Sequence, residues 1–459
     1  MVAIVTDDLK HTLSEFILED SAAKYYIGVG KPDSYDSSDT TSTPINSNFE
    51  EQEARSNLMS VKRVDNVSYV IPRFNWTSGT IYDAWSDASV GVPSNTFYVL
   101  TEDNEVYICI QKGIDNTGNA NQSTVKPSFT NAGVAETAIF QTADGYKWKL
   151  AYTLSTARAN IFLTSGFMPV EYVKNITGPN TVQTQQKTIE ANADSGAIVG
   201  VRIIDGGTGY VGATTQVNFL GNGSGASATA TISGGSIVKV EMNDSAAAVG
   251  NGGGRDYSYA SATVTGNATL KPILSSKNGL GSDILRDLKA SSVMFNVKTV
   301  GNENNTFTTL NDFRQITLFR GLHTHAGAGS PAVPITGTGY KVGRFVDLTQ
   351  NASAVSISAD ATITDDTLGV TATIIEKDSD GSNPAGGKAR LRFIQNQNNV
   401  IGAFGANNTL NTSSFTVGTH GDSNGYVDIY SGDLLYIENR AKIQRANDQT
   451  EDIKIILTV

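Results

Sequence analysis

Apolar residues recur at helical spacing in only a few short stretches of this chain. Residues 9–17 place four apolar side chains on one stripe of a helix. Asp7 and Asp8 precede this stripe, where an N-cap and a first-turn acid belong. We therefore expect a helix that begins near Asp7 and is ended by the two glycines and the proline of residues 28–32.

Three further short helices are predicted, each from a Ser residue that can cap the first turn and from the apolar residues behind it. The first of them also has a Glu three positions after the Ser, which is the capping-box pattern. The expected helices cover residues 47–59, 155–162 and 282–288.

From Val61 onward the apolar period changes to two, which is the pattern of half-buried strands. Four polar residues separate two of these runs, as in a β-hairpin. The last run alternates up to Val459, and such an apolar terminus is expected inside a sheet. The expected strands are 67–71, 96–101, 106–111, 433–437 and 453–459.

Two stretches differ in composition from the rest of the chain. Residues 181–272 are rich in Gly, Ala, Ser and Thr and nearly free of large aromatic residues. Within them, residues 199–207 are echoed by residues 238–244 at an offset of 39 residues. Two copies of a β unit packed on each other would explain this repeat, since a solenoid needs at least three. Residues 331–428 form the second stretch and also have the pattern of a small β module.

Composition supports a fold built on strands and turns. The 459 residues include 45 Gly and only 11 Pro, and charged residues make up 17%, below the ~25% typical of soluble domains. We predict a mainly β protein with a few short helices (α+β), whose sandwich- or barrel-like core carries two inserted small β modules. The core would comprise residues 1–180, 273–330 and 429–459, and the inserts residues 181–272 and 331–428.

Charge and cysteine content exclude several classes of function. The net charge is −11 and no basic block is present, which argues against a nucleic-acid partner. A single cysteine, Cys109, allows neither an intrachain disulfide nor a zinc site built on thiolates. No apolar run is long enough to span a membrane, and residues 1–10 lack the apolar core of a signal peptide. We expect a protein that is made and kept in a cytosol-like compartment, or that leaves it by a route other than secretion, without a membrane partner.

A few residues suggest metal or phosphate chemistry, but each has a simpler interpretation. His323 and His325 have the spacing of two ligands on one side of a strand, yet their Gly/Ala-rich surroundings offer nothing to orient the rings, so a surface loop is favoured. The glycines near residues 28–30 and 221–225 do not match a phosphate-binding loop and are expected in turns. Cys109 lies within an expected strand and is predicted to be buried and inert.

Two acidic pairs raise the question of calcium. Asp365-Asp366 and Asp378-Ser379-Asp380-Gly381 provide carboxylates close together, but they lack the spacing and the terminal Glu of an EF-hand loop. We favour Asx-rich turns, with structural calcium as the alternative. No Ser-His-Asp or Cys-His arrangement is apparent, so the residues alone define no active site.

Six short motifs occur in order along the chain and carry a resemblance to a known family. They are Val70-Ile71-Pro72-Arg73-Phe74-Asn75-Trp76, Val106-Tyr107-Ile108-Cys109, Asp144-Gly145-Tyr146-Lys147-Trp148, Phe313-Arg314-Gln315-Ile316-Thr317, Tyr436-Ile437-Glu438-Asn439-Arg440 and Asp448-Gln449-Thr450-Glu451. Together they resemble the dimeric baseplate wedge subunit of T-even-like contractile-tailed bacteriophages. The resemblance covers roughly residues 25–175, 280–320 and 430–459, and the two expected inserts depart from it.

The resemblance implies a structural protein with no catalytic activity and no cofactor. It implies a β-rich core, a homodimer in each of six wedges, and contacts to other wedge subunits that hold the baseplate ready for sheath contraction. Tail fibre or peripheral baseplate proteins are further candidate partners of the inserts. The protein would then be part of the virion, in the tail baseplate, and be assembled in the cytoplasm of a bacterial host.

The same motifs single out residues with expected structural roles. Arg73 is a candidate for a bidentate ion pair, and Asp144-Gly145 for a tight turn that aims the aromatic residues behind it into the core. Acids and bases near the two terminal strands, including Glu451, are expected to pair across them. The full set is Pro72, Arg73, Trp76, Asp144, Gly145, Trp148, Arg314, Glu438, Arg440 and Asp448.

Two other classes of function remain alternatives. The chain could be a tail-associated depolymerase of host polysaccharide, or it could carry a sugar-binding module in residues 181–272 or 331–428. Both need aromatic platforms, and these two stretches contain few aromatic residues. The structural class is therefore the favoured prediction.

Overall fold

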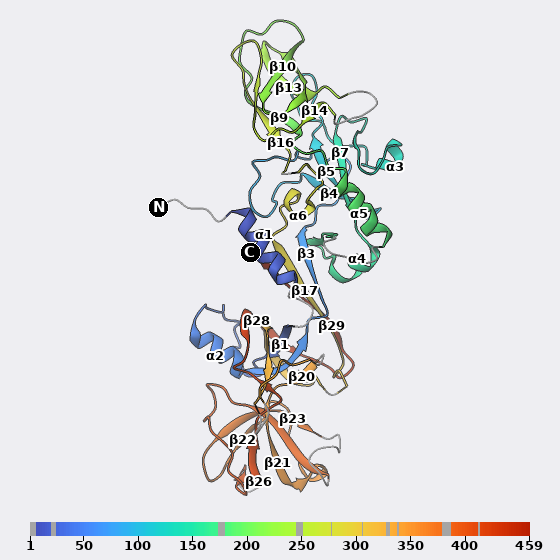
Figure 1. The fold of residues 1–459 in the computed structure, drawn as a ribbon. Helices are drawn as coiled ribbons and strands as arrows, with labels where there is room; N and C mark the ends of the chain where they lie inside the picture. The colour runs from blue at the N-terminus through green and yellow to red at the C-terminus, as the bar shows by residue number, and fades with distance from the viewer. Residues whose placement is uncertain are drawn as a thin grey trace. The chain divides into compact units, whose positions relative to one another are not determined.

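A computed structural model describes residues 6–19, 24–172, 180–244, 251–276, 278–304, 306–326, 331–336, 339–378, 387–411 and 414–459. The chain is mainly β, with 42% strand and 12% helix, and its sheets curl into barrel-like parts (Figure 1), which confirms the predicted fold class. It separates into two compact units. The first unit comprises residues 1–18, 68–294 and 456–459, and the second comprises residues 19–67 and 295–455.

A four-stranded antiparallel sheet with an aromatic core organises the first unit. The predicted hairpin is confirmed, because β4 (Tyr98–Leu100) and β5 (Glu105–Gln111) pair directly. β7 (Lys147–Thr153) and β6 (Ile139–Gln141) extend the sheet in the order β4-β5-β7-β6. The helices of this unit are α1 (Asp7–Glu19), α3 (Phe129–Ala132), α4 (Thr156–Phe162), α5 (Thr181–Ala191) and α6 (Ile284–Asp287).

The Gly-rich stretch of the first unit forms a curled six-stranded sheet with its own core. The two copies of the sequence repeat are β9 and β13, which stand at opposite ends of the strand order β13-β12-β10-β15-β16-β9 and yet contact each other. The sheet therefore nearly closes, and the expected packing of the two copies is found. The strands are β9 (Ile198–Asp205), β10 (Thr214–Gly221), β11 (Ser224–Ala226), β12 (Ala228–Ser233), β13 (Ser236–Met242), β14 (Gly253–Arg255), β15 (Ala260–Thr263) and β16 (Thr269–Leu274).

Helix α5 occupies the start of the segment that was expected to be inserted β structure. The side chain of Ile189, on α5, is buried in the aromatic core of the four-stranded sheet. Helix α5 therefore belongs to that core, and the β module begins only at β9. The sequence signal for this helix is a capping box. The side-chain oxygen of Asn180 accepts from Gln183 N, and the side-chain oxygen of Gln183 accepts from Asn180 N.

The second unit is built on a five-stranded antiparallel sheet in the order β20-β2-β1-β18-β28. α2 (Asn48–Ser56) lies beside it, with Ser47 as its N-cap. The helix ends at Ser56, where the strand β2 soon begins, rather than running on to residue 59. The strands are β1 (Tyr25–Gly30), β2 (Leu58–Arg63), β18 (Asp312–Arg320), β20 (Gly339–Lys341) and β28 (Asp433–Gln444).

Gly28 and Gly30 lie inside the buried strand β1, so the expectation that they end a helix is wrong. A Cβ on Gly28 would lie 2.5 Å from Leu58 Cδ1 and 2.5 Å from Thr317 Oγ1. Glycine at these two positions allows neighbouring strands and side chains to pack closely against β1, which is a known reason for glycine within a strand.

The stretch after residue 343 folds as a small barrel with its own apolar core. Its strand order is β22-β23-β24-β21-β26-β25, and a bridge between Asp365 and Leu410 joins the two ends. The expected loop at residues 378–387 falls almost entirely outside the described residues. The elements are β21 (Arg344–Asn351), η1 (Ala352–Ala354), β22 (Thr362–Thr364), β23 (Thr371–Asp378), β24 (Lys388–Ile394), β25 (Thr409–Leu410) and β26 (Phe415–Ser423).

The remaining strands include the predicted run at residues 67–71 and the apolar C-terminus, and both predictions are confirmed. One sheet has the order β29-β17-β3-β8, and β19 pairs with β27. The expected single core is divided, so that each unit holds part of it and one of the two small β modules. These strands are β3 (Asn66–Pro72), β8 (Phe167–Pro169), β17 (Ser292–Val300), β19 (His323–Thr324), β27 (Val427–Asp428) and β29 (Thr450–Thr458).

Candidate functional site

The first motif ends a strand and ties it to the loop before β8. Pro72 is the last residue of β3, and its carbonyl accepts from Tyr98 Oη at 2.8 Å. The guanidinium of Arg73 donates to Asn75 Oδ1 at 2.9 Å and to the carbonyl of Thr164 at 3.0 Å. Both of these acceptors are amide oxygens, whereas the sequence suggested a carboxylate.

Asp144 and Gly145 form the predicted tight turn. Gly145 donates its N–H to the carbonyl of Thr142 at 2.9 Å and has φ +90°, a conformation that suits glycine. Burial alone would raise the pKa of Asp144, but hydrogen bonds to its carboxylate outweigh burial and hold the pKa below its ordinary value. The donors are Thr142 Oγ1, Ser123 Oγ, Thr124 N and Val125 N.

The turn aims two aromatic rings into the core, as expected. Tyr146 and Trp148 are fully buried and stacked, with ring centroids 5.6 Å apart. Trp76 packs against the same cluster and donates from Nε1 to Ser123 Oγ at 3.1 Å. Since Ser123 also donates to Asp144 at 3.2 Å, the first and third motifs meet at one hydroxyl group.

Arg314 clamps the long loop that follows β1 in the second unit. Its Nε lies 2.7 Å from Asp39 Oδ1 and 2.9 Å from Asp39 Oδ2, and it also donates to the carbonyl of Pro32. The hydrogen bond from Arg314 lowers the pKa of Asp39. Tyr35 Oη donates to the carbonyl of Arg314 at 2.5 Å, so the motif residue organises a loop far away in sequence.

The charged residues near the C-terminus do not pair across the two terminal strands as expected. Glu438 and Arg440 lie on the same strand, β28, with Arg440 Nη1 4.0 Å from Glu438 Oε1. Glu451 on β29 instead pairs with the fully buried Arg445, 2.5 Å from Nε to Oε2. Asp448 is exposed in the turn between the strands. The correction follows from topology, because β28 and β29 belong to different sheets.

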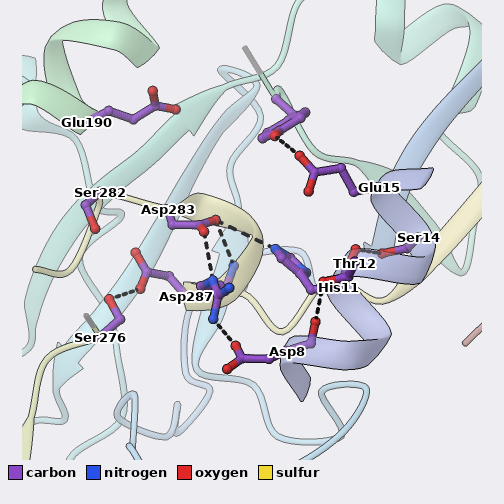
Figure 2. A network of polar contacts seen from close by, with 12 residues as sticks. Asp8, His11, Thr12, Ser14, Glu15, Glu190, Ser276, Ser282, Asp283 and Asp287 are labelled. Atoms are coloured by element: carbon purple, nitrogen blue, oxygen red, sulfur yellow. Dashed lines mark hydrogen bonds and ion pairs between the residues drawn. The ribbon is translucent and has the colours of Figure 1, made fainter. Parts of the chain in front are cut away.

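A polar network that the sequence did not indicate joins α1 to α6 in the first unit (Figure 2). Asp283 caps α6 by accepting from Arg286 N, and its carboxylate also lies 3.9 Å from His11 Nε2 on α1. Arg286 forms a second link by donating to Asp8. Burial would raise the pKa of Asp283, but the bonds from His11 and Arg286 lower it below its ordinary value. These charges fasten the N-terminal helix to the unit.

Asp287, one turn further along α6, has a very different environment. Its carboxylate is fully buried and accepts from Ser276 Oγ at 2.5 Å (Figure 2). It also accepts from Gly281 N at 2.6 Å. Burial raises the pKa of Asp287 to about 7. Its backbone carbonyl accepts from Trp85 Nε1 at 2.9 Å, which anchors the indole. A hollow of about 220 Å³ adjoins this network between α1, α6 and the loop after Trp85.

The residues that suggested metal binding lie apart from one another or have structural roles where the structure describes them. Among the described residues, no three His, Cys, Asp or Glu side chains gather as a metal site. His323 begins the two-residue strand β19, where a surface loop was favoured. Asp365 forms the predicted Asx turn by accepting from Thr367 N and Leu368 N at 2.9 Å each. The pair Asp378 and Asp380 lies outside the residues whose side chains are described.

Cys109 is fully buried in β5, as predicted, and burial raises the pKa of its thiol well above the ordinary value. Such a thiol is a poor nucleophile because little thiolate is present. The motif residues described above brace turns, strand ends and loops through internal hydrogen bonds.

Neither the known protein-family models nor the curated proteins include a match to this sequence. The helices in the described part of the chain are all too short or too polar to cross a membrane.

Proposed function

We propose that this chain is a structural subunit of a phage tail baseplate wedge, which joins neighbouring wedge subunits and holds the baseplate ready for sheath contraction. The proposal has the chain act as a homodimer within the virion, without catalysis or a cofactor. It rests on the resemblance of the six ordered motifs to the dimeric wedge subunit.

The observation that carries the proposal is where these motif residues lie. Trp76 and Asp144 meet at Ser123 in the first unit, and Arg314 binds Asp39 in the second. These are contacts between segments distant in sequence, which is what a protein needs to keep its shape under load. Conversely, a depolymerase would need acids presented in a cleft to its sugar substrate.

The two small β modules support the same proposal. Each has an apolar core of its own, and each lies between two successive motifs in the sequence. Such modules can add surface to a framework while leaving its joints unchanged. We assign them contacts with peripheral baseplate or fibre proteins.

Copy number in purified particles tests the proposal. Quantitative mass spectrometry of phage particles that encode this chain should find two copies for each of the six wedges, counted against the tail sheath protein as internal standard. Absence from the particle, or the stoichiometry of trimeric fibres, would contradict the proposal. Release of sugars from host polysaccharide by the purified chain would favour the depolymerase instead.

A further inference from the structure

Strand β28 ends the five-stranded sheet of the second unit, so one of its edges faces no other strand of that sheet. It is 12 residues long, from Asp433 to Gln444. A long edge strand offers a row of backbone N–H and C=O groups with which another strand can pair. This edge is therefore a candidate interaction surface.

The direction of the backbone groups shows which residues face the open edge. Backbone groups alternate in direction along an antiparallel strand. Gly321, just after β18, donates its N–H to the carbonyl of Lys24, just before β1, at 2.7 Å, so the odd-numbered residues of β18 direct their backbone groups to β1. The even-numbered residues of β18 therefore direct theirs to β28, where they pair with Glu438 and Tyr436. The backbone groups of Ile437 and Asn439 lie between these positions and point to the open edge.

Tyr35 satisfies the inner side of the strand where its pairing with β18 becomes irregular. Its hydroxyl accepts from Arg440 N at 3.0 Å and donates to the carbonyl of Arg314 on β18 at 2.5 Å. Tyr35 thus supplies the hydrogen bonds on the side of β28 that faces β18. The backbone N–H and C=O groups of Ile437 and Asn439 still point to the open edge.

The charges on β28 are self-complementary. Glu438 and Arg440 flank Asn439 on one face of the strand, and their side chains are 38% and 40% exposed. If two copies pair antiparallel about a two-fold axis through Asn439, Glu438 of each copy lies directly opposite Arg440 of the other. The axis then generates two ion pairs across the new strand pair.

An apolar strip beside the strand adds surface to bury. A groove of about 290 Å³ runs between the loop ahead of α2 and the first half of β28. Ile45 and Leu435, which line this groove, are 61% and 41% exposed. A second copy on the edge would cover these side chains, which contributes hydrophobic stabilisation that two half-exposed ion pairs do not supply.

We propose that β28 pairs with β28 of a second copy of this chain, antiparallel and centred on Asn439. The inference deepens the proposed function, on which its expectation of a homodimer rests, by naming the dimer surface. The occupant is a second copy rather than another protein because Glu438 and Arg440 are placed for reciprocal pairing.

A charge-swap experiment on the full chain tests the surface. The dissociation constant of the dimer is measured by sedimentation equilibrium for the native chain, Glu438→Arg, Arg440→Glu and the double variant. Each single reversal sets like charges opposite each other twice and should weaken the dimer at least about tenfold, whereas the double variant should return to within about threefold of the native value. Lys126→Glu, a charge reversal in the first unit, is the control and should leave the constant unchanged.

Foldedness of every variant is checked by far-UV circular dichroism, so that loss of structure is not mistaken for loss of pairing. A monomeric native chain, single reversals without effect, or a double variant no better than the singles would each overturn the inference. A dimer indifferent to these reversals leaves the proposed function intact. Conversely, a charge-sensitive dimer from a protein absent from phage particles would retain the surface and reject the wedge role.

Discussion

Asp365 closes the small barrel of the second unit, and its removal should open that barrel locally. The carboxylate is fully buried and accepts from the backbone N–H groups of Thr367, Leu368 and Gly405 at 2.9–3.0 Å. Both of its oxygens also accept from Asn408 Nδ2, at 3.0 and 2.9 Å. One side chain thus holds together the turn after β22 and the segment before β25, next to the bridge that joins the ends of the sheet.

Asp365→Ala leaves these donors without their acceptor. Hydrogen bonds to a charged group are each worth about 1.5–3 kcal/mol, but water can reach some of the loop N–H groups, so we expect a net loss of about 3–5 kcal/mol. Asp365→Asn keeps one acceptor oxygen and should cost about 2 kcal/mol. Thr367→Ala changes an exposed side chain in the same turn and should stay within about 0.5 kcal/mol of the native protein.

Hydrogen exchange read by mass spectrometry measures this loss where it occurs. A loss of 3 kcal/mol corresponds to exchange at least about 100-fold faster in the peptides that cover β22–β25. Trp76, Trp85 and Trp148 all lie in the first unit, so tryptophan fluorescence should report an unchanged unfolding transition there. Native-like exchange in the Ala variant would refute the reasoning, because the barrel would then close without this carboxylate.

The direction in which the pKa of Asp365 is shifted determines how the stability of the same barrel depends on pH. Burial would raise the pKa of Asp365, but the hydrogen bonds from Asn408, Gly405, Leu368 and Thr367 outweigh it and hold the pKa below its ordinary value. The stabilisation is therefore complete above the unfolded-state pKa of ~3.9 and is lost as pH falls through the lower folded-state pKa. Relative to the intrinsic exchange rate at each pH, protection of these peptides should fall in acid for the native chain and less so for Asp365→Asn.

Three further predictions concern other buried groups. Because burial raises the pKa of Asp287 to about 7, the first unit should lose stability as pH rises from about 4 to about 7. In urea unfolding followed by tryptophan fluorescence, Asp287→Asn should reduce this dependence of stability on pH. An unchanged dependence would assign the titration to another group. The thiol of Cys109 should react with a disulfide reagent only at the rate of unfolding, and rapid labelling of the native protein would show that β5 is accessible. Arg314→Lys loses the planar contact with Asp39 and should destabilise the second unit by about 2 kcal/mol in urea, whereas the half-exposed Arg63→Lys should change stability by less than about 0.5 kcal/mol; equal effects would contradict the clamp.

Local patterns in the sequence predicted the elements whose causes are local. The alternation at residues 67–71 and the capping residues Ser47 and Ser155 specify strands and helices within a few positions, and each was found. The strand β1 could not be predicted from local sequence, because Gly28 is required by its close packing against the side chains of Leu58 and Thr317, which are distant in the sequence. Helix α5 was missed because its apolar face is narrow, although its capping box was readable.

The site residues divide in the same way. Asp144 and Gly145 act within one turn, so their role could be predicted from the dipeptide itself. Arg314 binds Asp39 across 275 positions of sequence, and no local pattern reveals such a partner. The expected pairing across the terminal strands is wrong for the same reason, because strand order decides it and Glu451 pairs with the buried Arg445 instead.

Location within the phage tests the central claim most directly. Antibodies against the native chain, coupled to gold, should label intact particles at the end of the tail in a ring beneath the sheath. Labelling confined to the capsid, or to fibre tips away from the baseplate, would contradict the wedge assignment even if the chain proved to be a dimer.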